Sequence, residues 1–434
     1  MRTQVPVTGR GDRQFSKTAV ALDEKPAAGG RAHAEASRNH VLKIMHVTNS
    51  MALGGTEKVV LKLATGLTEG FDHHVCCVRS CDLNLVQRWL RPEQFTALEL
   101  PRSRFAVFVP QLVRAIRSYR PHIVHSRNWG AIEAVVAARI ARVPVVIHSE
   151  HGYDVDGLQE TPLRQRWMRR IVCSAADAVF TVSRELRDFH AMQAGVRPER
   201  IRVLYNGVDT QSFAPKPHVR ARVREEHGIG PGELVVGAVG RMVPIKDYET
   251  LIRAAGVLYK ANLPFKLVLV GDGPELPRLI ALAESLPGVR ACLLPLGRRD
   301  DIPDLLAAMD VFVQTSLREG MSNTLLEAMS AGLPAVVTCV GGNPEIVEEE
   351  KNGWLFRPGD VGNLSQILHR LAADCDLRSR AGEAGRRHVQ EKFSHKKMLE
   401  NYRALYIELA KKRNTYPTID QAKATVRPWG DGLA

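Results

Sequence analysis

Two glutamates, Glu319 and Glu327, flank a short stretch of small and polar residues. The stretch follows an apolar run at 311–315 and leads into a helical pattern that stops at Gly332. The first amides of a helix have no partner within the helix, so we expect an anion site around residues 320–323. A carboxylate on each side could accept hydrogen bonds from hydroxyls at the two ends of a ligand with a central diphosphate. The stretch between the glutamates begins with Gly320, Met321, Ser322 and Asn323.

Each glutamate also has a simpler explanation. Glu319 could be only a partner of the helix dipole, which is a common arrangement. Glu327 is harder to explain in this way, because it lies next to Leu326 and Ala328 and a carboxylate on a buried face needs a partner. We therefore favour a binding role for both carboxylates.

Two cations lie on another loop that follows a strand-like run. Gly240 ends that run, and Arg241 and Lys246 come before the next helical pattern. A guanidinium offers a planar fork and an ammonium offers a point charge, and both can hold a departing diphosphate. Lysine and arginine are usually only solvated, so this interpretation depends on the neighbouring segment 319–327.

The first half of the chain contributes two further candidates. Gly54 and Gly55 follow the first strand-like run, where missing side chains let a ligand approach closely. A tight turn would explain the two glycines equally well. His151 ends another apolar run, although a lone histidine is more often structural or exposed.

Short apolar runs alternate with helical patterns over most of the chain. This alternation predicts an α/β fold with parallel, doubly wound sheets, in which ligands bind at the carboxyl ends of the strands. A break near 206–217, marked by Asn206-Gly207 and two prolines, divides the runs into two sheets. The expected strands are 42–48, 74–79, 122–125, 143–148 and 178–182, then 234–240, 266–270, 291–294, 311–315 and 335–338.

The bulk composition is that of a globular protein with two domains. The chain has 434 residues, with 44% hydrophobic and 25% charged residues, and no apolar run long enough to span a membrane. The first thirty residues lack the apolar region of a secretory signal, so we expect none. Seven cysteines without a C-x-x-C pair favour a reducing compartment and no zinc site. The net charge of +13 is concentrated in the first half, which suits either an anionic partner or an ordinary solvated surface.

The sequence resembles the retaining glycosyltransferases of family four, which have the GT-B fold of two Rossmann-like domains that face each other across a cleft. The spacing of Glu319 and Glu327 is similar to the EX7E motif of that family, and Gly240-Arg241 with Lys246 is similar to its GR-x4-K motif. Several segments also resemble bacterial sugar transferases of exopolysaccharide biosynthesis and PEP-CTERM sorting. Further matching segments lie at 54–57, 150–152, 206–209, 271–275, 296–298 and 341–345.

Composition, the pattern of apolar runs and the resemblance together predict five parts along the chain. We expect a disordered leader at 1–40 and an acceptor-side Rossmann-like domain at 41–210. A Rossmann-like domain that binds the nucleotide sugar should follow at 211–395. A helix at 396–412 should pack back towards the first domain, and residues 413–434 should form a flexible tail.

The resemblance also implies roles for the candidate residues. Arg241 and Lys246 would hold the diphosphate of the donor, Glu327 would bind the ribose, and Glu319 would bind hydroxyls of the transferred sugar. His151 would lie near that sugar. The remaining donor-binding candidates are Gly54, Gly55, Gly240, Gly271, Gly273, Arg298 and residues 320–323, of which Gly271, Gly273 and Arg298 would border the base.

The expected reaction moves a sugar, with retention of its configuration, from a UDP- or GDP-linked donor to a glycan or lipid-linked acceptor. No cofactor is expected, because the nucleotide sugar is a co-substrate. Asp154 and Asp156 form a D-x-D pattern typical of metal sites in the other major glycosyltransferase fold. That fold would leave Arg241 and Lys246 unexplained, so we interpret both aspartates as polar loop residues and expect no required metal.

Two stretches mix cations with bulky apolar residues, at 102–120 and 164–171. They predict a cytoplasmic enzyme with peripheral contact to an anionic inner membrane, although ordinary amphipathic helices explain them about as well. Nucleic acid is not an expected partner, because no nucleic-acid-binding signature accompanies the charge.

Three alternatives remain from the sequence. A nucleotide-sugar epimerase or a phosphorylase could use the same fold, because a fold does not fix its chemistry. A glycan-binding subunit without activity is the third, although intact candidate residues argue against decay. A dinucleotide oxidoreductase is disfavoured, since no complete G-x-G-x-x-G fingerprint occurs.

Overall fold

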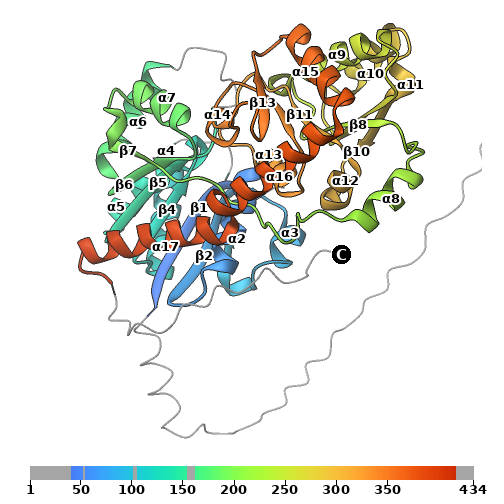
Figure 1. The fold of residues 1–434 in the computed structure, drawn as a ribbon. Helices are drawn as coiled ribbons and strands as arrows, with labels where there is room; N and C mark the ends of the chain where they lie inside the picture. Colours follow the sequence, from blue (N-terminus) through green and yellow to red (C-terminus); the bar gives the residue numbers. More distant parts are fainter. Residues whose placement is uncertain (1–40, 52–53, 101–104, 154–161, 417–434) are drawn as a thin grey trace, which may run out of the picture. The chain divides into compact units, whose positions relative to one another are not determined.

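The computed structural model describes residues 41–51, 54–100, 105–153 and 162–416 (Figure 1). The expected leader at 1–40, the D-x-D residues Asp154 and Asp156, and most of the expected tail lie outside the described residues. Residues 413–416 of that tail are described, and Arg413 donates from Nε to Asp177 Oδ1 over 2.9 Å.

The first sheet has seven strands in the order β3-β2-β1-β4-β5-β6-β7, and all of its pairings are parallel. Every residue of β4 and β5 is buried, as expected of strands covered by helices on both faces. The strands are β1 (Leu42–Met51), β2 (Phe71–Cys81), β3 (Phe95–Ala97), β4 (Ile123–Arg127), β5 (Val145–Glu150), β6 (Ala178–Thr181) and β7 (Ile201–Val203). The helices between them are α2 (Gly55–Gly66), α3 (Leu83–Gln87), α4 (Phe105–Tyr119), α5 (Glu133–Ile140), α6 (Leu163–Ala175) and α7 (Arg184–Ala194).

The second sheet has six strands in the order β10-β9-β8-β11-β12-β13, again all parallel. Its strands are β8 (Leu234–Val239), β9 (Phe265–Val270), β10 (Leu293–Gly297), β11 (Val311–Gln314), β12 (Ala335–Thr338) and β13 (Gly353–Phe356). Its helices are α8 (Pro217–Glu226), α9 (Tyr248–Lys260), α10 (Leu276–Ser285), α11 (Val289–Cys292), α12 (Ile302–Ala308), α13 (Asn323–Ser330), α14 (Asn343–Ile346), α15 (Val361–Ala373) and α16 (Cys375–Lys392).

The predicted α/β fold with two doubly wound sheets is therefore confirmed, with differences at particular strands. Three strands were not predicted, and each lies at the edge of its sheet: β3, β7 and β13. An edge strand needs only three or four paired residues, so it leaves little apolar pattern to read. The strand expected at 291–294 begins later, because residues 291 and 292 belong to α11.

The last helix, α17 (His395–Lys412), packs on the first sheet although it follows the second in sequence. Its buried face includes Leu399, Tyr402 and Tyr406, which share one core with Leu42, Phe180 and other residues of the first sheet. Ser394 caps the helix by accepting a hydrogen bond from the Lys397 amide.

The two chain segments that pass between the sheets are bonded to each other. Val208 donates its amide to Phe393 O over 2.9 Å, and His395 donates its amide to Val208 O over 2.7 Å. At Gly207 a Cβ atom would lie 2.7 Å from Ser394 O, so only glycine fits this close approach. The two crossing segments, 207–208 and 393–395, are therefore one hydrogen-bonded unit and not two independent linkers. We call this unit the strap.

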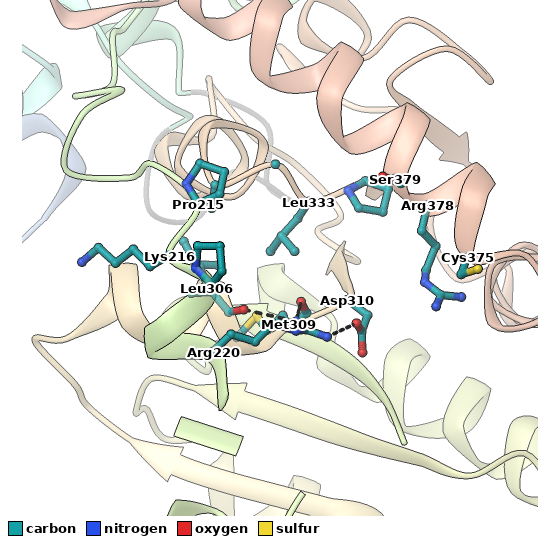
Figure 2. A pocket seen from close by; sticks show the side chains of 15 residues that line it. Pro215, Lys216, Arg220, Leu306, Met309, Asp310, Leu333, Cys375, Arg378 and Ser379 are labelled. Carbon is teal, nitrogen blue, oxygen red and sulfur yellow. Dashed lines mark hydrogen bonds and ion pairs between the residues drawn. The ribbon is translucent and has the colours of Figure 1, made fainter. Parts of the chain in front are cut away.

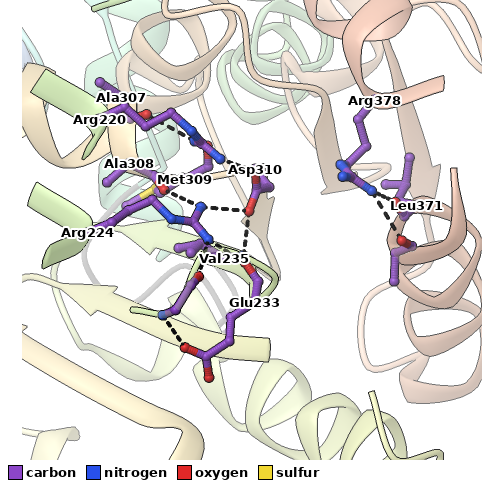
Figure 3. A network of polar contacts seen from close by, with 12 residues as sticks. Arg220, Arg224, Glu233, Val235, Ala307, Ala308, Met309, Asp310, Leu371 and Arg378 are labelled. Carbon is purple, nitrogen blue, oxygen red and sulfur yellow. Dashed lines mark hydrogen bonds and ion pairs between the residues drawn. The ribbon is translucent and has the colours of Figure 1, made fainter. Parts of the chain in front are cut away.

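A partly buried polar network anchors α8 to the second sheet (Figure 3). Asp310 accepts from Arg220 Nη2 at 2.5 Å, from Arg224 Nη1 at 3.2 Å and from the Val235 amide at 2.7 Å. Buried Arg224 and half-buried Arg220 thus share one charged partner, as a buried charge requires. Among the helices that the structure describes, none is long and apolar enough to cross a bilayer.

Candidate functional site

The loops after β8 and β11 lie together because the two strands are neighbours in the second sheet. Leu317 donates its amide to Ile245 O over 2.8 Å, and Thr315 Oγ1 donates to Lys246 O over 2.9 Å. These bonds bring Lys246 to the carboxylate of Glu319, with which its ammonium forms a short ion pair. Two residues that were predicted separately therefore lie in direct contact.

The Glu319 carboxylate is held by more than the lysine. Its Oε1 atom also accepts from Gln314 Nε2 and from Ser316 Oγ, both over 2.7 Å, and its side chain is only 10% exposed. Three donors on one oxygen fix the position of the carboxylate. Glu319 is thus a buried, preorganised acceptor, and not merely a surface partner of the helix dipole.

Gln314 is a site residue that the sequence analysis missed. It is the last residue of β11, and its Nε2 atom donates both to Glu319 and, over 2.9 Å, to Ser322 Oγ. Its Oε1 atom is buried and has no hydrogen-bond partner within the described residues. An amide side chain at the end of an otherwise apolar strand was the available signal, since buried polar groups need a reason to be there.

The helix expected after residue 320 begins slightly later, at Asn323. Ser322 is its N-cap and accepts the Leu325 amide over 3.2 Å, so this first-turn amide already has a partner. Gly320 and Met321 lie in the loop before the helix. Glycine is needed at residue 320, because a Cβ atom there would lie 2.4 Å from His151 O.

Glu327 lies on α13 with 9% of its surface exposed. Burial raises the pKa of its carboxyl, and the opposing cations Lys58 and Lys62 of α2 lower it in part. Lys62 is itself buried and donates to Gly207 O over 3.1 Å. The second carboxylate therefore faces lysines contributed by the first half of the chain.

The glycine pair predicted in the first half lies opposite the start of α13. A Cβ atom at Gly55 would come within 3.0 Å of Asn323 Nδ2. Next to this pair, burial raises the pKa of Glu57, while a hydrogen bond from Ser50 and the charge of Arg241 lower it in part. Arg241 is exposed near the start of the loop after β8, where its charge acts on a residue of the first half.

His151 follows β5 and joins a buried group of polar side chains. Its Nε2 atom lies 3.2 Å from Arg127 Nη1 and 3.0 Å from Ser149 Oγ, and its amide donates to Asn128 Oδ1 over 2.8 Å. Burial, followed by the charge of Arg127, lowers the pKa of His151 to about 3. The imidazole is therefore neutral at physiological pH. Arg127 was not predicted.

Two further glutamates, neither of them predicted as a site residue, connect the halves beside this group. Glu185 of α7 accepts the Gly341 amide over 2.7 Å and the Tyr153 hydroxyl over 2.6 Å. Glu345 of α14 accepts the Arg184 amide over 2.6 Å. These bonds hold the loop after β12 against the start of α7, close to Gly320, whose carbonyl accepts the Gly342 amide over 2.9 Å.

The three candidates expected near a base lie on neighbouring loops of the second sheet. Gly271 has φ +135°, and a Cβ atom there would lie 1.9 Å from Gly240 O. Gly273 is equally restricted, with Met242 O only 2.3 Å from such an atom. Arg298 is exposed directly after β10. Packing between loops thus explains both glycines without a ligand.

A metal cluster and a separate pocket are the other features that could mark a site. Within the described ranges, no group of three or more histidine, cysteine, aspartate or glutamate side chains is arranged to hold a metal ion. A separate pocket of about 320 Å³ lies between α8 and α16 (Figure 2), but no predicted site residue lines it. Its cations Lys216 and Arg220 are paired with Asp304 and Asp310.

Two family models match the two halves of the chain. The model described as Glycosyltransferase Family 4 matches residues 53–212, and the model described as Glycosyl transferases group 1 matches residues 219–388. Together they cover the second sheet, the first sheet apart from β1, and every predicted site residue within the described part of the chain. The chain belongs to the GT-B glycosyltransferases.

Individual relatives agree with this assignment. An Escherichia coli UDP-Gal:α-D-GlcNAc-diphosphoundecaprenol α-1,3-galactosyltransferase is 28% identical over 86% of this chain and 98% of its own length. The Bacillus subtilis putative glycosyltransferase EpsF is 28% identical over 79% of this chain and 88% of its own length. Among solved structures, Anabaena HepE in complex with UDP has a TM-score of 0.72 at 23% identity, covering 84% of this chain and 99% of HepE. The structural likeness concerns the fold alone.

Proposed function

We propose that this glycosyltransferase moves a sugar from a UDP- or GDP-linked donor to a lipid-linked or growing glycan in the synthesis of a bacterial exopolysaccharide or other cell-surface polysaccharide. The observation that carries the proposal is the contact of Lys246 with the buried, triply bonded carboxylate of Glu319 on adjoining strand-end loops. A cation and a fixed hydroxyl acceptor side by side suit the junction between a diphosphate and a sugar.

The relatives support the donor and acceptor classes. The E. coli relative is named for UDP-galactose and a diphosphoundecaprenol-linked acceptor. A Mycolicibacterium smegmatis relative, 34% identical over 57% of this chain, is named as a GDP-mannose-dependent mannosyltransferase acting on phosphatidylinositol monomannoside. Both acceptors carry a lipid, and the two donors differ in their base.

In the proposed mechanism, Arg241 and Lys246 hold the departing diphosphate while Glu319 and His151 hold the sugar. The bond from the anomeric carbon to the phosphate oxygen breaks, and the electron pair leaves with the phosphate. The acceptor oxygen bonds to the same face of the sugar, and its proton passes to the departing phosphate oxygen. This front-face route gives retention without a covalent enzyme intermediate, and it assigns no step to a metal ion. Glu327 binds the ribose hydroxyls.

A screen of nucleotide sugars tests this function. A bound donor should raise the melting temperature by mass action, and product analysis with lipid-linked and free glycans should follow. Transfer with release of a nucleoside diphosphate and an unchanged anomeric configuration is expected. An isomerised nucleotide sugar without acceptor would indicate an epimerase, and consumption of inorganic phosphate would indicate a phosphorylase. Glycan binding without donor turnover would indicate an inactive subunit. Each of these three results contradicts the proposal.

We further propose that the enzyme contacts the anionic cytoplasmic face of the inner membrane through α6. Leu163, Trp167 and Ile171 recur on one side of this helix with 75%, 70% and 43% of their surface exposed. The helix contains no acidic residue, and no ion pair within the described residues involves its exposed arginines Arg164, Arg166 or Arg170. Exposed apolar residues among unpaired cations suit an anionic bilayer surface.

Vesicle co-sedimentation tests the membrane contact separately from catalysis. The protein should bind vesicles that contain phosphatidylglycerol and not neutral phosphatidylcholine vesicles, and salt should weaken the binding. The double variant Trp167→Ser with Ile171→Ser should lose most of the binding. The matched control Val257→Ser alters an apolar residue that is 47% exposed on α9 and should bind normally. Equal binding by the α6 variant and the control would refute the role of α6.

A further inference from the structure

Arg127 is a fully buried cation surrounded by histidines. It ends β4 with 1% of its surface exposed. Its Nη1 atom lies 3.2 Å from His151 Nε2, and its Nη2 atom lies 3.2 Å from His46 Nδ1 and 3.3 Å from His125 Nδ1. No carboxylate pairs with it within the described residues. Burying a charge without a counter-charge is unfavourable, so Arg127 is unlike an ordinary core residue.

A guanidinium has donors only, which fixes the proton on each neighbouring ring. His46 must accept at Nδ1, so its Nε2–H donates to His73 Nδ1 over 2.9 Å. His73 in turn donates from Nε2 to Leu67 O over 2.8 Å. This branch ends on a carbonyl, and every ring nitrogen in it has a hydrogen-bond partner.

The second branch ends at His151. His125 accepts at Nδ1 from Arg127 and, over 2.9 Å, from the Tyr406 hydroxyl, so its Nε2–H donates to Ser149 Oγ over 2.9 Å. The Ser149 hydroxyl then donates to His151 Nε2 over 3.0 Å. His151 Nε2 therefore accepts from two donors, and the ring proton must lie on Nδ1.

The Nδ1 atom of His151 is buried and has no partner in the described residues. Every other ring nitrogen of this network has a hydrogen-bond partner. His151 also lies at the site, because its carbonyl is in contact with Gly320, next to Glu319. Apart from Arg127 Nε, which is also buried without a partner in the described residues, the unsatisfied N–H of this network is that of His151, the histidine whose backbone meets the loop of Glu319 and Gly320.

We propose that Arg127 is a positioning residue that fixes His151 as its Nδ1–H tautomer, so that this N–H donates a hydrogen bond to a hydroxyl of the transferred sugar. The inference rests on the proposed function for the identity of the ligand, but the tautomer does not depend on it. Burial and the charge of Arg127 also lower the pKa values of His46, His125 and His151, which keeps all three rings neutral donors and acceptors. His151 is then a hydrogen-bond donor and not a base.

Nitrogen-15 NMR of the full chain labelled at histidine tests the tautomer without turnover. The His151 signals, assigned by their loss in His151→Gln, should show the Nδ1–H form at neutral pH. In Arg127→Met the ring should become a mixture of tautomers and should titrate at a higher pH, because the cation that lowers its pKa is gone. Arg127→Lys should restore part of the wild-type spectrum. A wild-type Nε2–H form would overturn the proposal, even if the transferase assay succeeds.

Kinetics with deoxy sugars test the contact itself, using the donor identified in the screen. Arg127→Met should lower kcat about 10²-fold, as expected for a misplaced contact group. One mono-deoxy donor should be a poor substrate for the wild type. The kcat measured with this donor should not fall further in His151→Phe. If the loss of each hydroxyl lowers kcat by the same factor in His151→Phe as in the wild type, the hydrogen bond to the sugar is refuted. If Arg127→Met fails to fold, Arg127→Lys and His151→Phe supply the same comparison.

Discussion

The ion pair of Lys246 with Glu319 connects the roles that were predicted for the two residues separately. The sequence placed one on the diphosphate and the other on the sugar, whereas the structure joins them through one carboxylate oxygen that also binds Gln314 and Ser316. A carboxylate held by three donors keeps its other oxygen oriented for a ligand. The ion pair is therefore a link between the two ends of the proposed donor site.

Glu319→Gln should separate chemistry from nucleotide binding. The amide would place an N–H₂ group or a weaker acceptor against three donors, so we expect kcat to fall by about 10² to 10³. The affinity for the free nucleoside diphosphate, measured by calorimetry, should change less than about threefold, which is under 1 kcal/mol. Glu383→Gln on the exposed face of α16 is the control and should be normal. An unchanged kcat, or an equal loss of nucleotide affinity, would contradict this role.

At the residue scale, the sequence was informative where a motif was local. Glu319, Lys246 and Gly320 lie in short motifs, and the structure brings them together. Arg127 and Gln314 were missed because each is one polar residue at the end of an apolar strand, and their partners are far away in sequence. Such residues become visible only when the sheet order places neighbouring strand ends together.

Among the elements, α17 shows best how the two halves depend on each other. It follows the second sheet in sequence, yet it buries Tyr402 and Tyr406 completely in the core of the first. Tyr406 also donates to His125, one of the histidines around Arg127. The sequence predicted that this helix packs back, but not that it completes the network behind His151.

Tyr402→Ala should therefore destabilise the protein strongly. Removing a fully buried aromatic ring costs about 3–5 kcal/mol, and chemical denaturation should show a loss of this size in the free energy of unfolding. Lys396→Ala, on the exposed side of the same helix, should change it by less than about 0.5 kcal/mol. A small effect of the tyrosine variant would mean that α17 does not pack as described.

At the scale of the whole molecule, one paired strap connects the two sheets. The chain crosses near Gly207 and returns near Ser394, and these segments share backbone hydrogen bonds. Lys62 donates to Gly207 O from α2, and the charge of Lys62 acts on Glu327 of α13. The strap thus lies beside the carboxylate proposed to bind ribose, so both halves contribute to one site.

The two-sheet plan could be predicted because buried parallel strands produce continuous apolar runs that alternate with helices. The contacts between the halves could not be predicted, because nothing in the sequence distinguishes Glu185, Glu345 and Tyr153 from ordinary surface residues. Their partners are backbone amides and hydroxyls whose positions depend on the complete fold.

The central claim is that the strand-end loops of the second sheet handle the leaving diphosphate. The most direct test is acceptor-dependent release of nucleoside diphosphate by Lys246→Ala, with the exposed α9 variant Lys260→Ala as the control. We expect Lys246→Ala to lose about 10³-fold in kcat with an unchanged melting profile, because it removes a cation placed where negative charge grows. A folded Lys246→Ala protein whose kcat is within about twofold of the wild-type value would contradict the account. That factor corresponds to about 0.4 kcal/mol of activation free energy.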